Sequence, residues 1–445
     1  MKNETIILLA PLKDYREHKL CKYAPYWGFG HPFWLYDYEP LKRIFSRVIV
    51  YDYIERLPEK GFKEINEELV ELVKIEKPKY IIWPSVNYEF LESTFDKIRE
   101  LGTKIIGLFF DDEFRFDKYS KYWIPHLDFC VTNCEEVLEK YKKLGAKVIH
   151  VFVCHNFPLD VNWGNIQYKY DVSFVGSRNI ERLRYIREIR KRKINIHLFG
   201  RGWNLRGWIP FEEMLKIFQT SKINLNFSGT KENKKGWKGR MLEVVNAGGF
   251  LLTEFRPGIE KFFEIDKEIV CFKNANEMVE KITYYLNHEE ERKRIAQAGW
   301  KKGITTYTPL HMYSKIFKAI ENSSSIEKRN NEFPLETINM PKEIRRIPSY
   351  YYLNWGNVFL IANNKGFWKD AFSISLFYDP SNFQTKIFQF IGSMPFFVRS
   401  IILLPYALLL KSLKFLKKIL TLFPFPFFVW KVYYKLKAIS RGENL

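Results

Sequence analysis

Cysteine is scarce in this chain of 445 residues. Its five cysteines are odd in number and scattered, which argues against a disulfide framework and favours a reducing, cytoplasmic compartment. Cys130 and Cys134 stand close together, yet a structural zinc site takes four ligands and no second Cys or His pair has a suitable spacing. We therefore predict no metal site and no cofactor.

Long apolar runs are also missing. The N-terminal stretch MKNETIILLAPLKDY is too short in its apolar part for a signal peptide, so we predict a first β-strand and no export. Residues 396–445 combine apolar and aromatic runs with nine Lys or Arg and one Glu. These runs fall short of the roughly 20 residues that a membrane-spanning helix needs. Basic residues interrupt them at Arg399, Lys411, Lys414, Lys417 and Lys418.

Two interpretations of this basic tail, residues 396–445, stay open. Its apolar side chains can lie in the headgroup region of an anionic membrane, with the lysines facing water, which would make the protein peripheral at the inner face of the cell membrane. It can also be a basic amphipathic helix docked on the protein itself. We expect the first arrangement.

Acidic residues are in deficit, since 71 Lys and Arg stand against 51 Asp and Glu, a formal charge of +20. Such a charge attracts nucleic acid, anionic lipid or phosphorylated small molecules. No RRM, KH or helix-turn-helix pattern is present, and the basic excess is concentrated in the tail. We therefore expect no specific nucleic-acid partner.

The domain organisation follows from an alternation of strand and helix patterns. From residue 4 to about 155, β-rich runs alternate with amphipathic helices, and a second alternation begins after a linker-like segment at 154–165. Such alternation predicts an α/β fold with two Rossmann-like domains facing a cleft. The expected boundaries are 1–155 and 156–321 for the two domains, 322–332 for a linker, 333–395 for a helical extension and 396–445 for the tail.

The strand patterns are short and rich in β-branched and aromatic residues. The predicted strands are Thr5–Leu9, Val48–Tyr51, Tyr80–Trp83, Lys104–Phe110, Phe129–Thr132 and Val148–Phe152 in the first domain, and Asp171–Val175, Ile194–Phe199, Ile223–Phe227 and Phe250–Thr253 in the second. Helices lie between them, including Lys63–Lys74 and Tyr88–Leu101.

The second domain opens with DVSFVGSR, residues 171–178. A strand that ends in Gly176 and Ser177 before a helix places backbone N–H groups where anions bind. Arg178 or Arg182 can then neutralise a diphosphate. An ordinary strand-to-helix turn with a solvated arginine explains the same residues equally well.

Two further glycines, Gly200 and Gly202, end the next strand in HLFGRGW, residues 197–203. They allow the backbone to approach a ligand closely, although Gly-x-Gly alone is a weak signal. Trp203 beside them is either a core residue or a platform for a nucleotide base.

A Gly-rich basic loop before a helix is the most specific feature, in KGWKGRMLEVVNAGGFLLTE, residues 235–254. Lys238, Gly239 and Arg240 supply flexible backbone, two cations and a helix dipole for a pyrophosphate. Glu243, one turn into the helix, can accept hydrogen bonds from both hydroxyls of a ribose. Alone, it would be interpreted as a first-turn acid that the helix dipole stabilises.

The first domain offers candidates for catalysis. Asp111 and Asp112 follow a strand at the edge that would face the cleft, where a base can deprotonate an acceptor hydroxyl if the reaction inverts; capping of the loop is the alternative. His31 lies in the aromatic loop YWGFGHPFW and His155 in the interdomain linker. Either can contact substrate or make a structural hydrogen bond. Aromatic residues at 26–36 can stack on a sugar or fill a hydrophobic lip.

The order of these motifs resembles the donor domain of CgeB-type, spore maturation protein-like glycosyltransferases, a branch of the group 1 GT-B superfamily. The resemblance covers about residues 80–320 and rests on FVGSR, LFGRGW, INLNF, R-x-x-E-x-x-x-x-GG and LNHEEERKRIAQAGW with Tyr307. It implies that the second domain binds the donor, with Glu243 on the ribose and Arg240 on the phosphate side. Lys235 departs from the pattern, because another Glu usually stands there.

These features together predict a glycosyltransferase that moves a sugar from a nucleotide-diphosphate donor to a glycan, lipid-linked or protein acceptor. No metal is implied, since Arg, Lys and helix dipoles can stabilise the leaving diphosphate. The alternative is a catalytically inactive protein of the same fold that binds nucleotide-sugars or serves as a scaffold.

Overall fold

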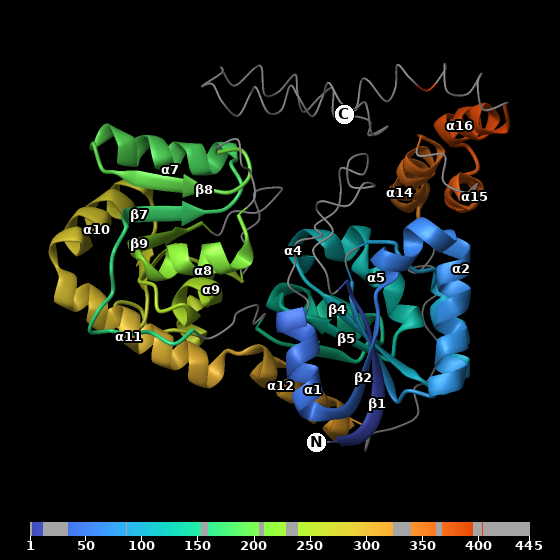
Figure 1. Cartoon of the computed structure of the whole chain (residues 1–445), viewed down its shortest axis with the longest axis horizontal. Coiled ribbons are helices and arrows are strands. Elements are labelled where there is room, and N and C mark those ends of the chain that lie inside the picture. Colours follow the sequence, from blue (N-terminus) through green and yellow to red (C-terminus); the bar gives the residue numbers. More distant parts are fainter. Residues whose placement is uncertain are drawn as a thin grey trace.

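The structure, a computed structural model, describes residues 2–11, 34–85, 87–152, 159–203, 209–227, 239–323, 340–361, 367–394 and 403. Figure 1 shows two α/β units side by side, the first in blue and teal and the second in green and yellow, with orange-red helices beside the first. Each unit contains a parallel sheet with helices packed on it. The predicted α/β class with two Rossmann-like sheets is therefore confirmed.

The first sheet has six parallel strands among the described residues, in the order β2-β1-β3-β4-β5-β6. In β1, Ile7 and Leu9 join one hydrophobic core while Ile6 and Leu8 join another, because successive side chains point to opposite faces. The strand is buried on both sides, as parallel sheets between helices are. The strands are β1 (Lys2–Leu9), β2 (Phe45–Tyr51), β3 (Tyr80–Pro84), β4 (Lys104–Phe109), β5 (Phe129–Thr132) and β6 (Val148–His150).

Helices of the first unit divide between these two faces. Residues of α2 (Tyr53–Glu76) and α3 (Glu92–Glu100) belong to the core of Ile7, and α1 (Glu39–Ile44) contributes to the core of Ile6. A π-helical turn, η2 (Trp34–Tyr38), runs directly into α1. The shorter helices are α4 (Asp112–Arg115), α5 (Ser120–Trp123) and α6 (Leu138–Lys143).

The second sheet has five parallel strands among the described residues, in the order β11-β10-β9-β7-β8. Four of them were predicted; the fifth, β11, spans only three residues, too few to show a periodicity. The strands are β7 (Tyr170–Val175), β8 (Ile196–Phe199), β9 (Ser221–Asn226), β10 (Leu251–Glu254) and β11 (Val270–Phe272). The helices are α7 (Ile180–Lys191), α8 (Phe211–Gln219), α9 (Arg240–Asn246), α10 (Ala275–Asn287) and α11 (Glu289–Thr306).

The first five strands of each sheet have the same order when each sheet is counted from its own first strand. In each, the first strand lies between the second and the third, so the order reverses between β1 and β3 and again between β7 and β9. Ligands of open α/β sheets bind beyond the carboxyl ends of the strands at such points. The chain after β1 and the chain after β7 are therefore the places to look for a site.

The last helix of the second unit returns to the first unit. α12 (Pro309–Ser323) follows α11 and packs against α1 and the start of β2, where the ring of Phe317 lies 4.7 Å from that of Phe45. The Tyr313 hydroxyl donates a hydrogen bond of 2.6 Å to Asp37 in η2. Because α12 is continuous with the second unit and packed on the first, it ties the two together.

Direct contacts also join the units near the carboxyl end of β5. Lys261 pairs with Glu135 at 2.8 Å, and Arg256 pairs with Glu136. The Phe152 and Phe262 rings stack with centroids 4.1 Å apart. This edge of the first sheet therefore borders the second unit.

The C-terminal helices pack on the first unit. These are α14 (Lys342–Ile361), α15 (Trp368–Tyr378) and α16 (Phe383–Ser393). The Tyr352 ring lies 4.9 Å from that of Phe62 in α2, and its hydroxyl donates to the Tyr88 carbonyl at 2.7 Å. Residues of α14 and α15 are thus part of the same core as α2 and α3. Among the described helices, none is both long and apolar enough to cross a membrane.

Candidate functional site

The turns after β7 and β8 are locked to each other by backbone hydrogen bonds. The Gly176 N–H donates to the Phe199 carbonyl at 2.9 Å, and the Arg178 N–H donates to the Arg201 carbonyl at 2.8 Å. Gly200 has φ 105°, and a Cβ there would lie 2.7 Å from the Gly176 carbonyl oxygen. The glycine is therefore required for this close approach of two backbones, whatever else it contacts.

Aromatic side chains fix the arginines of this region. Trp203 donates its indole N–H to the Gly176 carbonyl at 2.8 Å, and the Arg178 guanidinium lies 6.0 Å from the centre of the Trp203 ring. Gly202 lies close to Arg178. A Cβ at position 202 would come within 3.0 Å of the Cβ of Arg178. Trp203 therefore has a structural role at this turn.

A second cation, Arg182, stands one helical turn into α7. Its Nη1 donates to the Ser177 carbonyl at 2.6 Å, while its buried Nε has no acceptor among the described residues. Burial lowers the pKa of Arg182, and the positive charge of Arg240 lowers it further. Two guanidinium groups close enough to repel each other form a place where an anion would be stabilised.

Arg240 and Glu243 meet at the start of α9. Arg240 Nη1 lies 2.6 Å from Glu243 Oε2, as expected for residues three apart on a helix. The same guanidinium contacts Met214 and lies 5.5 Å from the Phe218 ring. Gly239 begins this helix with φ −51°, an ordinary helical value, so its backbone has no need of glycine in this structure.

The carboxylate of Glu243 is buried, with a side chain that is 11% exposed. Burial raises the pKa of Glu243, while the charge of Arg240 and a hydrogen bond from the Tyr36 hydroxyl work in the opposite direction. Tyr36 comes from η2 in the first unit, and its oxygen lies 3.4 Å from Glu243 Oε1. No sequence pattern pairs these residues, which are 207 positions apart.

In the first unit, Asp112 is inconsistent with its predicted role as a base. Its side chain is 1% exposed, and its oxygens accept hydrogen bonds from the hydroxyls of Ser120, Thr132 and Tyr141. Burial raises its pKa to about 6, although those three bonds oppose the rise. An enclosed carboxylate with this set of donors links α4 to α5, β5 and α6, which gives Asp112 a structural role.

Asp111 lies at the same strand end but in a different environment. It is half-buried and has φ 63°, a left-handed conformation that Asp tolerates better than most residues. Its strand, β4, neighbours β5, whose following turn carries the Glu135 and Glu136 contacts to the second unit. Asp111 stays a candidate base. His31, His155, Lys238 and Lys235 lie outside the described residues.

No metal centre is visible in the described part of the chain, where no three His, Cys, Asp or Glu side chains are grouped as ligands. The chemistry that the described residues offer is electrostatic. Arg182 and Arg240 can bind a diphosphate, and Glu243 can accept hydrogen bonds from vicinal hydroxyls.

Comparison with known proteins finds one family match and one distant relative. Residues 180–318 match a family described as glycosyl transferase-like. The chain is 21% identical over 311 residues to the spore protein CgeB of Bacillus subtilis (strain 168), a match that covers 61% of this chain and 95% of CgeB.

Two solved structures show partial likeness. A glycosyltransferase from Rickettsia africae has a TM-score of 0.42 at 12% identity, covering 72% of this chain and 99% of that one. HepE of Anabaena in complex with UDP-glucose has a TM-score of 0.42 at 9% identity, covering 73% of this chain and 100% of that one.

Proposed function

We propose that this chain, a distant homologue of CgeB with a glycosyltransferase domain, transfers a glycosyl group from a nucleotide-diphosphate sugar to a hydroxyl-bearing acceptor. The donor binds the second unit beyond the carboxyl ends of β7 and β9. The acceptor, a glycan, a lipid-linked saccharide or a protein, approaches from the first unit. The observation that carries this proposal is the ion pair of Arg240 with the buried carboxylate of Glu243, with Arg182 near enough to Arg240 for their positive charges to interact.

Each of these groups has a distinct part in the proposed reaction. Glu243 accepts hydrogen bonds from the ribose hydroxyls, which fixes the nucleoside. The bond between the anomeric carbon and the diphosphate oxygen breaks, and the negative charge that develops on the diphosphate is stabilised by Arg182 and Arg240. The acceptor oxygen forms the new bond and gives up its proton. In an inverting reaction Asp111 accepts that proton.

One observation favours the alternative of a nucleotide-sugar-binding protein without turnover. Asp112, one of two predicted bases, is 1% exposed and enclosed by three hydroxyl donors. If an acid of the first unit is the catalytic base, Asp111 is the remaining candidate among the described residues. Turnover, and not binding, separates the two functions.

The test is thermal-shift binding of UDP, GDP and dTDP and their sugar derivatives to the wild type and to Arg240→Ala and Glu243→Ala. We expect one diphosphate nucleoside to stabilise the wild type by several degrees, and its affinity to fall at least about tenfold in both variants, since each removes a charged partner. Arg190→Ala, which removes an exposed arginine of α7, serves as the matched control.

Turnover is then measured as hydrolysis of the nucleotide-sugar that stabilises the wild type. Asp111→Asn should keep donor binding and lose transfer if Asp111 is the base. Binding without turnover in the wild type supports the alternative. If no nucleotide stabilises the folded wild type, the proposed donor site is wrong.

We further propose that the protein lies on the cytoplasmic face of an anionic membrane. In α16, Phe383, Ile387 and Phe390 recur at helical spacing, and the two phenylalanines are 71% and 65% exposed. The helix carries Lys386 and no acidic residue. Residues 340–445 contain 15 Lys or Arg and four Asp or Glu, a net +11 of the chain's +20. Exposed aromatic side chains next to a basic segment suit an anionic lipid surface.

A further inference from the structure

Tyr36 of the first unit donates a hydrogen bond to Glu243 of the second unit. It is 1% exposed, so its hydroxyl is enclosed between the units. Its ring packs edge-on against Phe211 of α8, with centroids 5.6 Å apart. The side chain of Tyr36 therefore reaches from η2 into the second unit and contacts both α8 and α9.

The position of Tyr36 is fixed by its neighbour. Asp37 is buried, and one of its carboxylate oxygens accepts a hydrogen bond of 2.6 Å from the buried Tyr313 hydroxyl of α12. Since α12 belongs in sequence to the second unit and packs on the first, this bond anchors η2 to the segment that joins the units. Tyr36 is thus held in place from one side by α12 and from the other by Phe211.

We propose that Tyr36 is a positioning residue of the donor site, contributed by the first unit. Its hydroxyl holds the Glu243 carboxylate in the orientation that receives the ribose hydroxyls, together with Arg240. Recognition of the ribose by the second unit then depends on a residue of the first. This inference rests on the proposed donor site and adds a contact between the two units that sequence motifs do not show.

The charges around Glu243 make this role measurable. Glu243 binds ribose hydroxyls as an ionised acceptor, and burial already raises its pKa. Arg240 of α9 and Tyr36 of η2 both favour the ionised form, and Asp37 lies close enough to Tyr36 to raise the pKa of that hydroxyl. Removal of the Tyr36 hydroxyl raises the Glu243 pKa further. Nucleotide binding should then be lost at a higher pH than in the wild type.

The experiment compares Tyr36→Phe with Tyr313→Phe in the full chain. Both variants remove one buried hydroxyl that donates to a carboxylate, but only Tyr36 contacts Glu243. UDP is the first probe, followed by GDP and dTDP, with affinity measured by calorimetry from pH 5.5 to 8.5. Tyr36→Phe should weaken binding about fivefold at pH 6 and move the acidic limb of the profile to higher pH. Tyr313→Phe keeps the Tyr36 hydroxyl and loosens only the anchor of η2, so the midpoint of that limb should move less than in Tyr36→Phe.

A double-mutant cycle with Glu243→Gln isolates the pair. If Tyr36 acts through Glu243, its effect on affinity disappears in the Glu243→Gln background. An unchanged pH midpoint in Tyr36→Phe, or an effect that persists without the carboxylate, would overturn the proposal.

The same double-mutant cycle of Tyr36→Phe and Glu243→Gln is also measured by the Tm of thermal unfolding without nucleotide. If no nucleotide binds the wild type, the proposed function is wrong, while coupling of Tyr36 to Glu243 in this unfolding cycle still supports the positioning contact. Additive changes in Tm would refute that contact as well.

Discussion

Buried carboxylates at the junction of the units carry an energetic cost that depends on pH. Asp37 is buried, and its carboxylate accepts a hydrogen bond from the Tyr313 hydroxyl. Burial raises the pKa of Asp37 to about 7, although the bond from Tyr313 opposes the rise. The folded protein therefore binds a proton that the unfolded chain has already lost, so stability from this group falls as pH rises from about 4 to about 7.

Asp37→Asn should remove this dependence. The Tm of the variant minus that of the wild type should increase between pH 5 and pH 8, by an amount equivalent to about 2–4 kcal/mol, because only the wild type carries a buried charge at the higher pH. The amide that replaces the carboxylate lowers stability by a similar amount at every pH, so the change of the difference with pH is the test. Calorimetry at four or five pH values measures it.

The control is Asp117→Asn, the same change at an exposed carboxylate that is 61% accessible and pairs with Lys140. Its Tm difference should stay nearly constant over this range. A flat difference for Asp37→Asn would show that Asp37 is hydrated and ionised in the folded protein, contrary to the structure.

At this residue scale, some contacts follow from the spacing of residues in the sequence and others do not. Arg240 and Glu243 are three residues apart on a helix, so helical geometry alone brings them together, as found. Asp111 and Asp112 are adjacent and looked equivalent, but neighbouring residues at a strand end point in different directions, and only Asp112 faces the core. Tyr36 belongs to the aromatic segment 26–36 singled out from the sequence, but its contact with Glu243 could not be predicted, because that partner lies in the other unit.

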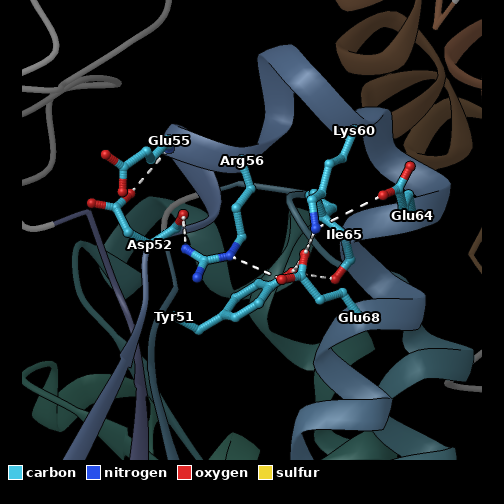
Figure 2. A network of polar contacts seen from close by, with 8 residues as sticks. All are labelled: Tyr51, Asp52, Glu55, Arg56, Lys60, Glu64, Ile65 and Glu68. Atoms are coloured by element: carbon cyan, nitrogen blue, oxygen red, sulfur yellow. Dashed lines mark hydrogen bonds and ion pairs between the residues drawn. The ribbon is translucent and has the colours of Figure 1, made fainter.

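Among the elements, α2 is two helices joined at a kink. Gly61 has φ 75° and ψ 176°, and Pro58 lies just before it. Figure 2 shows the polar network that spans the kink: Glu68, from the second half, accepts hydrogen bonds from Lys60 at 2.9 Å and Arg56 at 3.3 Å, both from the first half. The predicted helix over Lys63–Lys74 begins only after this kink, since Gly and Pro usually end a helix.

Gly61 also makes room for the C-terminal extension. A Cβ at this position would lie 2.8 Å from the Phe367 ring, so Gly61→Ala combines an unfavourable backbone conformation with a clash. We expect a loss of about 2–4 kcal/mol, from roughly 1 kcal/mol of backbone strain and 1–3 kcal/mol of overpacking. Urea unfolding of the full chain measures it.

Gly102→Ala separates the two contributions. Gly102 has φ +88°, but a Cβ there would have no heavy atom within 4 Å. Only the backbone strain of about 1 kcal/mol should appear. Equal losses in the two variants would mean that Phe367 moves away at no cost, and that the contact between α2 and the extension contributes little.

For the whole molecule, the helices after residue 340 are structurally inseparable from the first unit. The sequence predicted a helical extension, and helices are found, but an amphipathic pattern shows only that one face is buried and not what covers it. Tyr352 packs on Phe62, and the Tyr378 hydroxyl donates to Glu92 at 2.5 Å. A deletion that begins before α14 would therefore expose the core of the first unit, so tests of membrane binding need the full chain.

The membrane prediction uses substitutions at the exposed aromatic residues of α15 and α16. Replacing Phe377, Phe383 and Phe390 with Ser should weaken binding to phosphatidylglycerol-containing vesicles at least about tenfold, since each phenylalanine loses part of the 1.5–3 kcal/mol that full burial of its side chain provides. The matched control replaces Ile75, 75% exposed on α2, and Ile180, 50% exposed on α7, with Ser. Vesicle flotation measures binding, and raising the salt concentration should weaken it because the tail is basic.

Each alternative occupant of this surface gives a different result. If the wild type does not float with anionic vesicles, or if the triple variant floats as the wild type does, this surface is not a membrane contact. A triple variant that changes from dimer to monomer in light scattering without a change in flotation would show that a second copy covers α16. If the triple variant loses flotation but hydrolyses the donor at the wild-type rate, the membrane contact is supported and has no part in donor chemistry.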